Sequence, residues 1–126
     1  MVSEEFIGEI ETRLVKSFLD IIILQVIAIK GKAGGYELNR FLTDRFKRNL
    51  SSGTLYAAMY LLERKGLIQG EAVDRKTVYS LSQKGVTLLD NIRSSDEELR
   101  RFTALIFGNN NDWRTLWVPR NPSKPY

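Results

Sequence analysis

Residues 49–68 read NLSSGTLYAAMYLLERKGLI, and this stretch decides the fold. Its apolar residues follow the i, i+3, i+4, i+7 spacing of a helix that buries one face: Leu55, Ala58, Met59 and Leu62. The opposite face carries small residues near its start, then a tyrosine and an arginine: Gly53, Ala57, Tyr60 and Arg64. We therefore predict a helix over residues 52–65 whose outer face lies in solvent. Such a face is typical of a helix that enters the DNA major groove with its N-terminal residues at the base edges.

Composition narrows the class of protein. The chain has 126 residues, of which 43% are hydrophobic, which is enough for one packed domain with an appended helix or tail. Its net charge is +4 and its pI is about 9.5. A pI above about 9 is typical of nucleic-acid-binding domains, although mildly basic surfaces that bind none share it.

The absence of cysteine and histidine excludes disulfides, zinc sites built from these residues and imidazole-dependent catalytic triads. No pair of carboxylates stands out as a general acid and base, so we expect no enzyme, no cofactor and no metal. The N-terminus lacks the pattern of a secretion signal, and the apolar run at 18–29 is too short to cross a bilayer. These features predict a cytoplasmic protein without a membrane partner.

The residues before this stretch favour helices. Ser3 can cap a helix with acids in its first turn, and the length of the apolar run at 18–29 favours a helix over a strand. Residues 31–35 are expected to form a turn. A second amphipathic helix follows up to Phe46, with polar residues outward in and after it: Asn39, Arg40, Lys47 and Arg48.

Two short strands are expected after Gly66, at 67–72 and 77–81, joined by the polar loop 73–76. Helical spacing returns from Ser82, with two apolar stripes: Val86, Leu89 and Ile92, and then Leu99, Phe102 and Ile106. Between the stripes, Ser94 with Glu97 and Ser95 with Glu98 make two overlapping capping-box patterns. The sequence leaves open whether residues 82–107 form one helix or two.

This order of elements predicts a mainly α-helical protein with a small β-hairpin, a winged helix-turn-helix domain followed by a C-terminal dimerisation helix. We divide the chain into an N-terminal helix (1–17), the winged domain (18–85), the dimerisation helix or helices (86–107) and a tail with Trp and Pro residues (108–126). In the tail, Trp113 and Trp117 lie four residues apart. They are expected to clasp the tail to its own domain or dimer mate, the alternative being a platform for a flat ligand or a partner.

Five segments resemble the PadR-type winged-helix transcription regulators, in that family's order and spacing. They are FLDIIIL at 18–24, GYEL at 35–38, LSSGTLY at 50–56, Leu62-Glu63 with Gly66-Leu-Ile68, and VYSLSQKG at 78–85. The resemblance covers residues 18–89 and implies a homodimeric DNA-binding repressor whose C-terminal helices pair. It also implies, for some members, an aromatic small-molecule effector held near the dimer interface. The chain departs from the family pattern at four positions: Gly34, Ala57, Leu61 and Ser82.

Carried over by position, the resemblance implies that residues at the start of helix 52–65 touch DNA and that two wing residues contact phosphates: Ser51, Ser52, Thr54 and Tyr56, and then Arg75 and Lys76. The residue chemistry agrees, because hydroxyls and free amides at a helix start suit a phosphate oxygen. Gly53 and Ala57 allow close approach, while Tyr60 and Arg64 lie deeper and arginine can pair with guanine. Arg40, Lys47 and Arg48 precede the helix and could anchor the DNA backbone.

Simpler interpretations stand beside these. Ser51 and Ser52 can act as helix caps, the cluster from Arg40 to Arg48 can be a solvated face, and Tyr56 can be partly buried in the core. Arg75 and Lys76 can serve to keep the hairpin loop soluble.

We expect a homodimer on a pseudo-palindromic site in double-stranded DNA, with helix 52–65 in the major groove and wing 68–81 on the backbone. The apolar stripes are expected to form the dimer interface, at Leu89, Ile92, Leu99, Phe102 and Ile106. The alternatives are a winged helix that binds protein, and an architectural protein that coats DNA without sequence preference.

Overall fold

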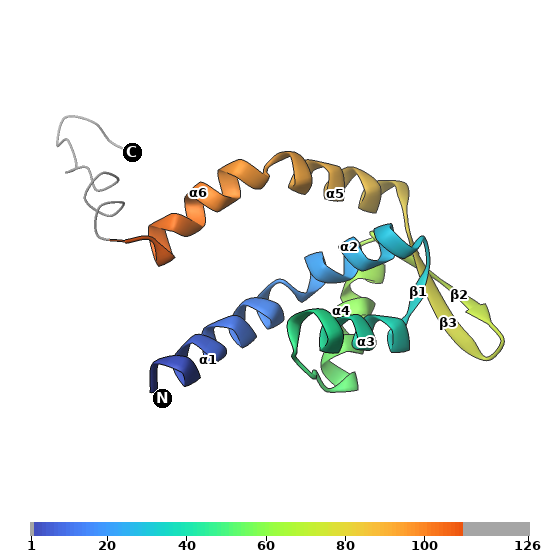
Figure 1. The fold of residues 1–126 in the computed structure, drawn as a ribbon. Coiled ribbons are helices and arrows are strands. Elements are labelled where there is room, and N and C mark those ends of the chain that lie inside the picture. Colours follow the sequence, from blue (N-terminus) through green and yellow to red (C-terminus); the bar gives the residue numbers. More distant parts are fainter. Residues whose placement is uncertain (1, 110–126) are drawn as a thin grey trace. The chain divides into compact units, whose positions relative to one another are not determined.

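The computed structural model describes residues 2–109, so Trp113 and Trp117 lie outside the described residues. Figure 1 shows the elements in chain order: α1 (Val2–Ser17), α2 (Leu19–Lys30), β1 (Ala33–Gly34), α3 (Gly35–Phe46), α4 (Ser52–Arg64), β2 (Ile68–Val73), β3 (Lys76–Leu81), α5 (Gln83–Ser94) and α6 (Asp96–Phe107). The chain divides after Asp90 into two compact units. The first unit has the helix and hairpin order of a winged helix, which confirms the predicted mainly α-helical winged helix-turn-helix fold; the dimerisation role of the C-terminal helices stays a prediction. Among the described helices, none has the length and apolar character needed to cross a membrane.

Helix α2 forms the centre of the first unit. It is apolar on nearly every side and buries five residues: Leu19, Ile23, Leu24, Val26 and Ile27. Helix α1 buries Val15 alone, and its Phe6 and Ile7 stay more than half exposed. The two helices meet at Phe18, which leaves helical geometry while its backbone still bonds to Leu14 and Ile22. The break between α1 and α2 therefore lies at Phe18, and both helices belong to the first unit.

Helices α3 and α4 form the helix-turn-helix. Leu38 and Leu42 anchor α3 in the core, and α3 ends where Lys47 adopts a left-handed backbone with φ 56°. Helix α4 begins after Ser51, whose hydroxyl accepts from the Thr54 amide at 3.2 Å. Its predicted apolar face packs inward at Leu55, Met59 and Leu62. The structure therefore confirms the helix predicted over 52–65.

The sheet has one strand more than predicted. Strand β3 lies in the middle of the antiparallel order β1-β3-β2, and β1 pairs Ala33 with Tyr79 and Gly34 with Val78. The turn expected at 31–35 was therefore partly wrong, because a two-residue strand shows no periodicity of its own. Strand β1 joins the start of α3 to the hairpin.

The hairpin itself is tighter than predicted. Its strands reach Val73 and Lys76, so the loop contains two residues, Asp74 and Arg75, with φ 48° and 68°. Positive φ at both central residues is the pattern of a type I′ turn, whose twist matches that of the flanking strands. The tight turn carries Arg75 at the tip of the wing.

The C-terminal region forms two helices that meet at Ser95. The hydrogen-bond ladder continues through the junction, since the Ser95 amide donates to Asn91 and Ile92 and the Leu99 amide donates to Ser95. The capping boxes predicted there are not formed: Ser95 makes no side-chain cap bond, and the Ser94 hydroxyl donates back to the Asn91 carbonyl. The two serines therefore do not start a separate helix by side-chain capping.

Leu89 was wrongly assigned to the dimer interface. It is 2% exposed and belongs to the core of the first unit, on the same side of α5 as buried Gly85. A Cβ atom at Gly85 would overlap the carbonyl of Leu67, so glycine lets α5 approach the end of α4 closely. That approach buries Leu89 within its own subunit.

Candidate nucleic-acid interface

The outer face of α4 lies in solvent. Gly53, Ala57, Tyr60 and Arg64 are all exposed, and a Cβ atom added at Gly53 would meet nothing within 4 Å. The Arg64 guanidinium carbon lies 5.8 Å from the centre of the Tyr60 ring, so the two side chains form a cation–π pair. This face, which was predicted to carry small residues near the start of the helix and polar residues further along, is thus accessible to a partner.

The start of α4 is built as a capped helix end. Besides capping the Thr54 amide, the Ser51 hydroxyl lies 2.8 Å from the Thr54 hydroxyl. Ser51, Ser52 and Thr54 are exposed. The cap interpretation of Ser51 is therefore confirmed, whereas Ser52 is the first residue of the helix. A cap satisfies one amide, and the other early amides of a helix have no intrahelical acceptor, so this end retains a capacity for anions.

A cleft of about 400 Å³ separates the wing from the start of α3. It brings together three residues that the sequence placed at the DNA surface, Tyr56 from α4 and Arg75 and Lys76 from the wing. Tyr36 and Tyr79 also line it. Arg75 and Lys76 form no ion pair with any described residue, so both charges are available to a ligand.

Tyr56 is 54% exposed, so part of its ring packs against the protein while the rest is accessible to a ligand. Its hydroxyl lies over the first turn of α3, where a Cβ atom at Gly35 would approach it to 2.5 Å. Glycine at position 35 therefore makes room for the phenol. Nearby, burial raises the pKa of Tyr79, and the negative charge of Glu63 and the neighbouring Tyr56 raise it further.

Arg48, predicted to contact DNA, makes its hydrogen bonds within its own chain. Its Nε donates to the Thr12 hydroxyl at 2.8 Å, and its Nη2 donates to the Gly8 carbonyl at 3.2 Å and to Glu11 at 3.4 Å. Its Nη1 donates to two carbonyls of the turn after α3, those of Phe46 and Lys47, each at 3.2 Å. Because these acceptors engage all three nitrogens of the guanidinium, Arg48 ties α1 to the turn of the helix-turn-helix.

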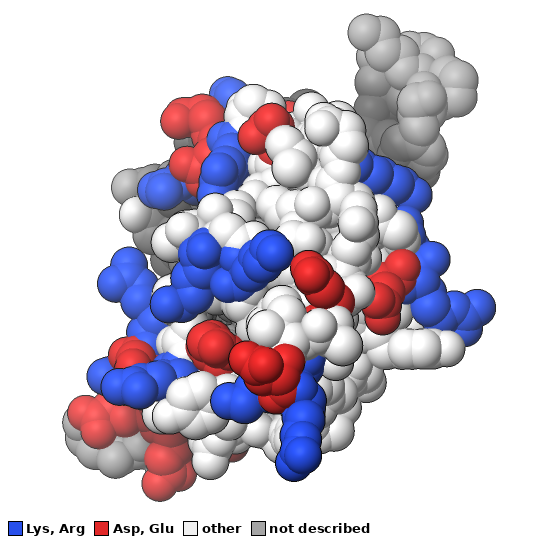
Figure 2. Space-filling view, turned by 90° about the vertical axis from the view of Figure 1, so that its right-hand side faces the viewer, with Lys and Arg blue, Asp and Glu red and all other residues white. Residues whose placement is uncertain are grey.

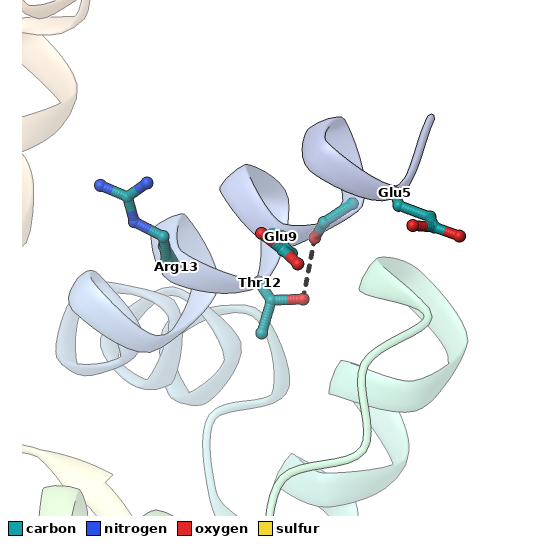
Figure 3. Close-up of a pocket in the computed structure, with 5 residues that line it drawn as sticks. Glu5, Glu9, Thr12 and Arg13 are labelled. Atoms are coloured by element: carbon teal, nitrogen blue, oxygen red, sulfur yellow. Dashed lines mark hydrogen bonds between the residues drawn. The ribbon is translucent and has the colours of Figure 1, made fainter. Parts of the chain in front are cut away.

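Figure 3 shows the part of α1 that receives this arginine. The Thr12 hydroxyl donates to the Gly8 carbonyl at 3.0 Å, with Glu5, Glu9 and Arg13 along the same stretch of helix. These five residues line an open hollow of about 520 Å³. Thr12 and the Gly8 carbonyl thus form a small acceptor site for Arg48, on a helix whose other contacts with the core are few.

Arg40 and Lys47 remain exposed and do not line the cleft. Arg40 lies 3.7 Å from the Asp44 carboxylate, and the Lys47 ammonium donates to the Asp44 carbonyl at 3.0 Å. Asn39, expected to point outward with them, instead has a buried side-chain oxygen without a hydrogen-bond partner among the described residues. The contacts of Arg40 and Lys47 with Asp44 lie at the surface and are therefore weak, so both cations can still reorient toward a phosphate.

Figure 2 shows the side of the molecule on which β2 and β3 lie in Figure 1. Basic and acidic side chains are interspersed on it, beside a broad area without charge. A mixed face of this kind produces a weak long-range field. Any attraction for DNA on this face therefore depends on a few individual basic side chains rather than on an extended basic patch.

Sequence reasoning missed Tyr36 and Tyr79 as site residues. Tyr36 is 71% exposed in the first turn of α3, and Tyr79 sits on the central strand, opposite Gly70. The available signal was the GYEL motif, which places an exposed tyrosine at a helix start. Tyr79 lies in the VYSLSQKG segment, but an aromatic residue in a strand is usually interpreted as packing, so no site role was assigned to it.

Comparison with known proteins identifies the class. Residues 23–91 match the model of the transcriptional regulator PadR-like family, which is more than half of the chain. The chain therefore belongs to the PadR-like family of transcriptional regulators. The match begins inside α2 and spans the helix-turn-helix, the wing and most of α5.

Among curated proteins, the chain is 28% identical over 105 residues to the transcriptional activator GvpE of Haloferax mediterranei. The alignment covers 83% of this chain and 54% of GvpE, so the chain spans about half the length of this relative.

Solved structures share the fold. A PadR family transcription regulator from Eggerthella lenta is 20% identical with a TM-score of 0.67, over 87% of this chain and 99% of that one. A PadR family regulator from Clostridium difficile is 23% identical with a TM-score of 0.64, over 72% and 99%. A winged-helix DNA-binding protein from STIV is 26% identical with a TM-score of 0.51, over 68% and 87%.

Proposed function

We propose that this chain is a sequence-specific DNA-binding regulator that acts as a homodimer, with α4 in the major groove and the wing on the adjacent backbone. The exposed face of α4 supports this proposal most directly, because it combines small residues at the helix start with Tyr60 and Arg64 further along. A recognition helix reads base edges mainly with its N-terminal residues, where bulky side chains would hold the backbone away from the groove.

Each part of α4 has a distinct proposed role. The hydroxyls of Ser51, Ser52 and Thr54, with the amides beside them, bind a phosphate and fix the register of the helix on the duplex. Gly53 and Ala57 let the helix approach the base edges. Arg64 reads a guanine from the far end of the helix, and its stacking on Tyr60 limits the orientations of the guanidinium.

The wing adds contacts to the backbone. Arg75 and Lys76 share one cleft with Tyr56 and Tyr36, so a phosphate placed there would lie near two cations and two tyrosines whose hydroxyl groups can donate hydrogen bonds. Each phosphate neutralised contributes about 0.9 to the slope of log K against log salt concentration. We also assign backbone contacts to Arg40 and Lys47.

The proposed homodimer uses the apolar residues of the C-terminal helices. On α6, Leu99, Phe102 and Ile106 are spaced along one helical face and are 48%, 63% and 60% exposed. Ile92 precedes them at the end of α5. Pairing two copies along this stripe would remove a large apolar surface from water.

Selection of bound sequences from a random pool of DNA duplexes tests the proposal. We expect enrichment of pseudo-palindromic sites with half-sites centred about 10 base pairs apart. Retention of DNA without enrichment would indicate an architectural coat protein, and absence of retention would indicate a winged helix that binds protein. Either outcome contradicts the proposed function.

The direction of regulation and the effector also belong to the proposal. We propose repression, tested with a reporter whose promoter overlaps a selected site; increased transcription would contradict it. GvpE, in contrast, is named an activator. We further propose an aromatic effector near the dimer interface. A panel of planar aromatic compounds that leaves the Kd for the selected duplex unchanged would count against that part.

A further inference from the structure

Strand β2 lies at the edge of the sheet, where a backbone amide that faces outward needs a partner from elsewhere. The Gly70 amide of β2 donates to the carboxylate of Glu63, at 3.1 Å from Oε2. Glu63 is the penultimate residue of α4. This hydrogen bond therefore joins the proposed recognition helix directly to the wing.

The space around Gly70 is fitted to this contact. A Cβ atom at position 70 would lie 3.0 Å from the Glu63 carboxylate, 3.0 Å from the Tyr79 ring and 3.1 Å from the Thr77 methyl group. A side chain at this position would therefore have to displace these neighbours by a few tenths of an ångström. Glycine leaves the Glu63 carboxylate close to the amide without that displacement.

Two attachments fix the wing to the end of α4. At its base, the Ser82 amide donates to the Leu67 carbonyl at 3.0 Å, and the Ser82 hydroxyl donates to the Gly66 carbonyl. Glu63 supplies the second attachment, part of the way along β2. Strand β1 also holds the hairpin, through its pairing with β3. Glu63 adds the contact that joins the other strand, β2, to a side chain of α4.

The wing extends beyond the second attachment to its charged tip. Gly70 and Val73 are three residues apart along β2, which corresponds to about 10 Å of strand. If the hairpin tilts about its base at Leu67, the end of β2 at Val73 moves about twice as far as the Gly70 amide, and the tip with Arg75 and Lys76 moves further. Positioning at Gly70 matters most for these two residues.

We propose that Glu63 is a positioning residue, which holds the wing against α4 so that Arg75 and Lys76 reach the backbone of the duplex that α4 enters. This inference rests on the proposed function. Glu63 itself does not touch DNA in this account; it acts through the wing.

The test compares Glu63→Ala with Glu63→Gln in the full-length chain. Both variants remove one negative charge, so they change the attraction for DNA equally, but glutamine keeps an oxygen that accepts from Gly70. We expect Glu63→Ala to bind a selected duplex roughly two- to tenfold more weakly than Glu63→Gln, the range for one hydrogen bond. Its salt slope should be lower by up to about 1.8, the loss of two phosphate contacts.

The same pair of variants is then made in an Arg75→Ala/Lys76→Ala background. If Glu63 acts through the wing, the difference between alanine and glutamine disappears there. Equal binding of Glu63→Ala and Glu63→Gln in the unaltered background overturns the inference, as does a difference that persists without the two cations.

Hydrogen exchange of the Gly70 amide, followed by NMR without DNA, separates this inference from the proposed function. Exchange should be faster in Glu63→Ala than in wild type and close to wild type in Glu63→Gln. Unchanged exchange in both variants overturns the positioning role even if the duplex binds. Failure of the wild-type chain to bind any duplex instead refutes the proposed function, while exchange still reports whether Glu63 holds the strand.

Discussion

Replacing Arg48 by alanine separates a structural arginine from a DNA-binding one. The side chain is 21% exposed and donates to acceptors on α1 and on the turn after α3. We expect Arg48→Ala to weaken folding while leaving the number of phosphate contacts unchanged.

The size of the effect follows from these bonds. The bonds to the Thr12 hydroxyl and the Gly8 carbonyl are partly buried, and each contributes about 1 kcal/mol net. The ion pair with Glu11, whose carboxylate is 62% exposed, adds less than about 1 kcal/mol because water screens it. The sum is about 2–3 kcal/mol, which lowers the Tm of a small domain by an amount on the order of 10 °C.

The assay combines thermal unfolding with the salt dependence of duplex binding. Arg40→Ala is the matched control for stability, because it removes an exposed ion pair worth about 0.3–0.5 kcal/mol. Lys47→Ala is the control for DNA and should lower the salt slope by about 0.9. The structural role would be refuted if Arg48→Ala unfolded at the wild-type temperature and its slope of log K against log salt concentration fell by about 0.9.

Three further predictions test other parts of the account. Arg64→Ala should weaken binding to a selected duplex by about 1–3 kcal/mol, measured by titration; equal losses on selected and scrambled duplexes would exclude base reading. Phe102→Asp, which places a charge in the α6 stripe, should give monomers in analytical ultracentrifugation, and an unchanged dimer mass would show that the stripe is not the interface. Because the pKa of Tyr79 is raised on folding, the native state keeps a proton that the unfolded chain loses above about pH 10, so stability falls as pH rises through that range. Tyr79→Phe should lose less stability than wild type between pH 8 and pH 10.5 in urea titrations; parallel losses would contradict this.

The helices of the winged unit could be predicted from sequence because their signals are local. The apolar spacing of α4 and the cap at Ser51 lie within a few residues of each other, and the structure has both. Strand β1 could not be predicted, since Ala33 and Gly34 become a strand only by pairing with residues more than 40 positions away. Pairing at that separation leaves no periodic pattern in the shorter partner.

The errors at single residues have the same origin. Arg48 follows an exposed lysine in a polar turn, so its sequence context indicates a solvated cation. Besides two carbonyls of that turn, its acceptors include the Thr12 hydroxyl and the Gly8 carbonyl, which lie 36 and 40 residues earlier in α1. Leu89 belongs to an apolar stripe that could cover either its own core or a second subunit. In the structure Leu89 covers its own core, because Gly85 lets α5 pack closely against Leu67. Neither partner is visible from the neighbouring sequence.

The role of Glu63 was hidden for a related reason. Within the sequence it is one acid of a polar helix end, next to Arg64. Its function depends on an edge amide at Gly70 that becomes available only once the hairpin has formed.

The central claim is that the exposed face of α4 is the surface that meets DNA, and Ala57→Glu tests it most directly. Ala57 is exposed in the middle of α4, so glutamate fits there without disturbing the core. Val2→Glu, at a position 81% exposed in α1, introduces the same charge elsewhere and serves as the control. Binding of both variants to a selected duplex is measured at one salt concentration, after their folding is confirmed by thermal unfolding. The account predicts that Ala57→Glu abolishes specific binding while Val2→Glu binds like wild type; specific binding by a folded Ala57→Glu variant would contradict it.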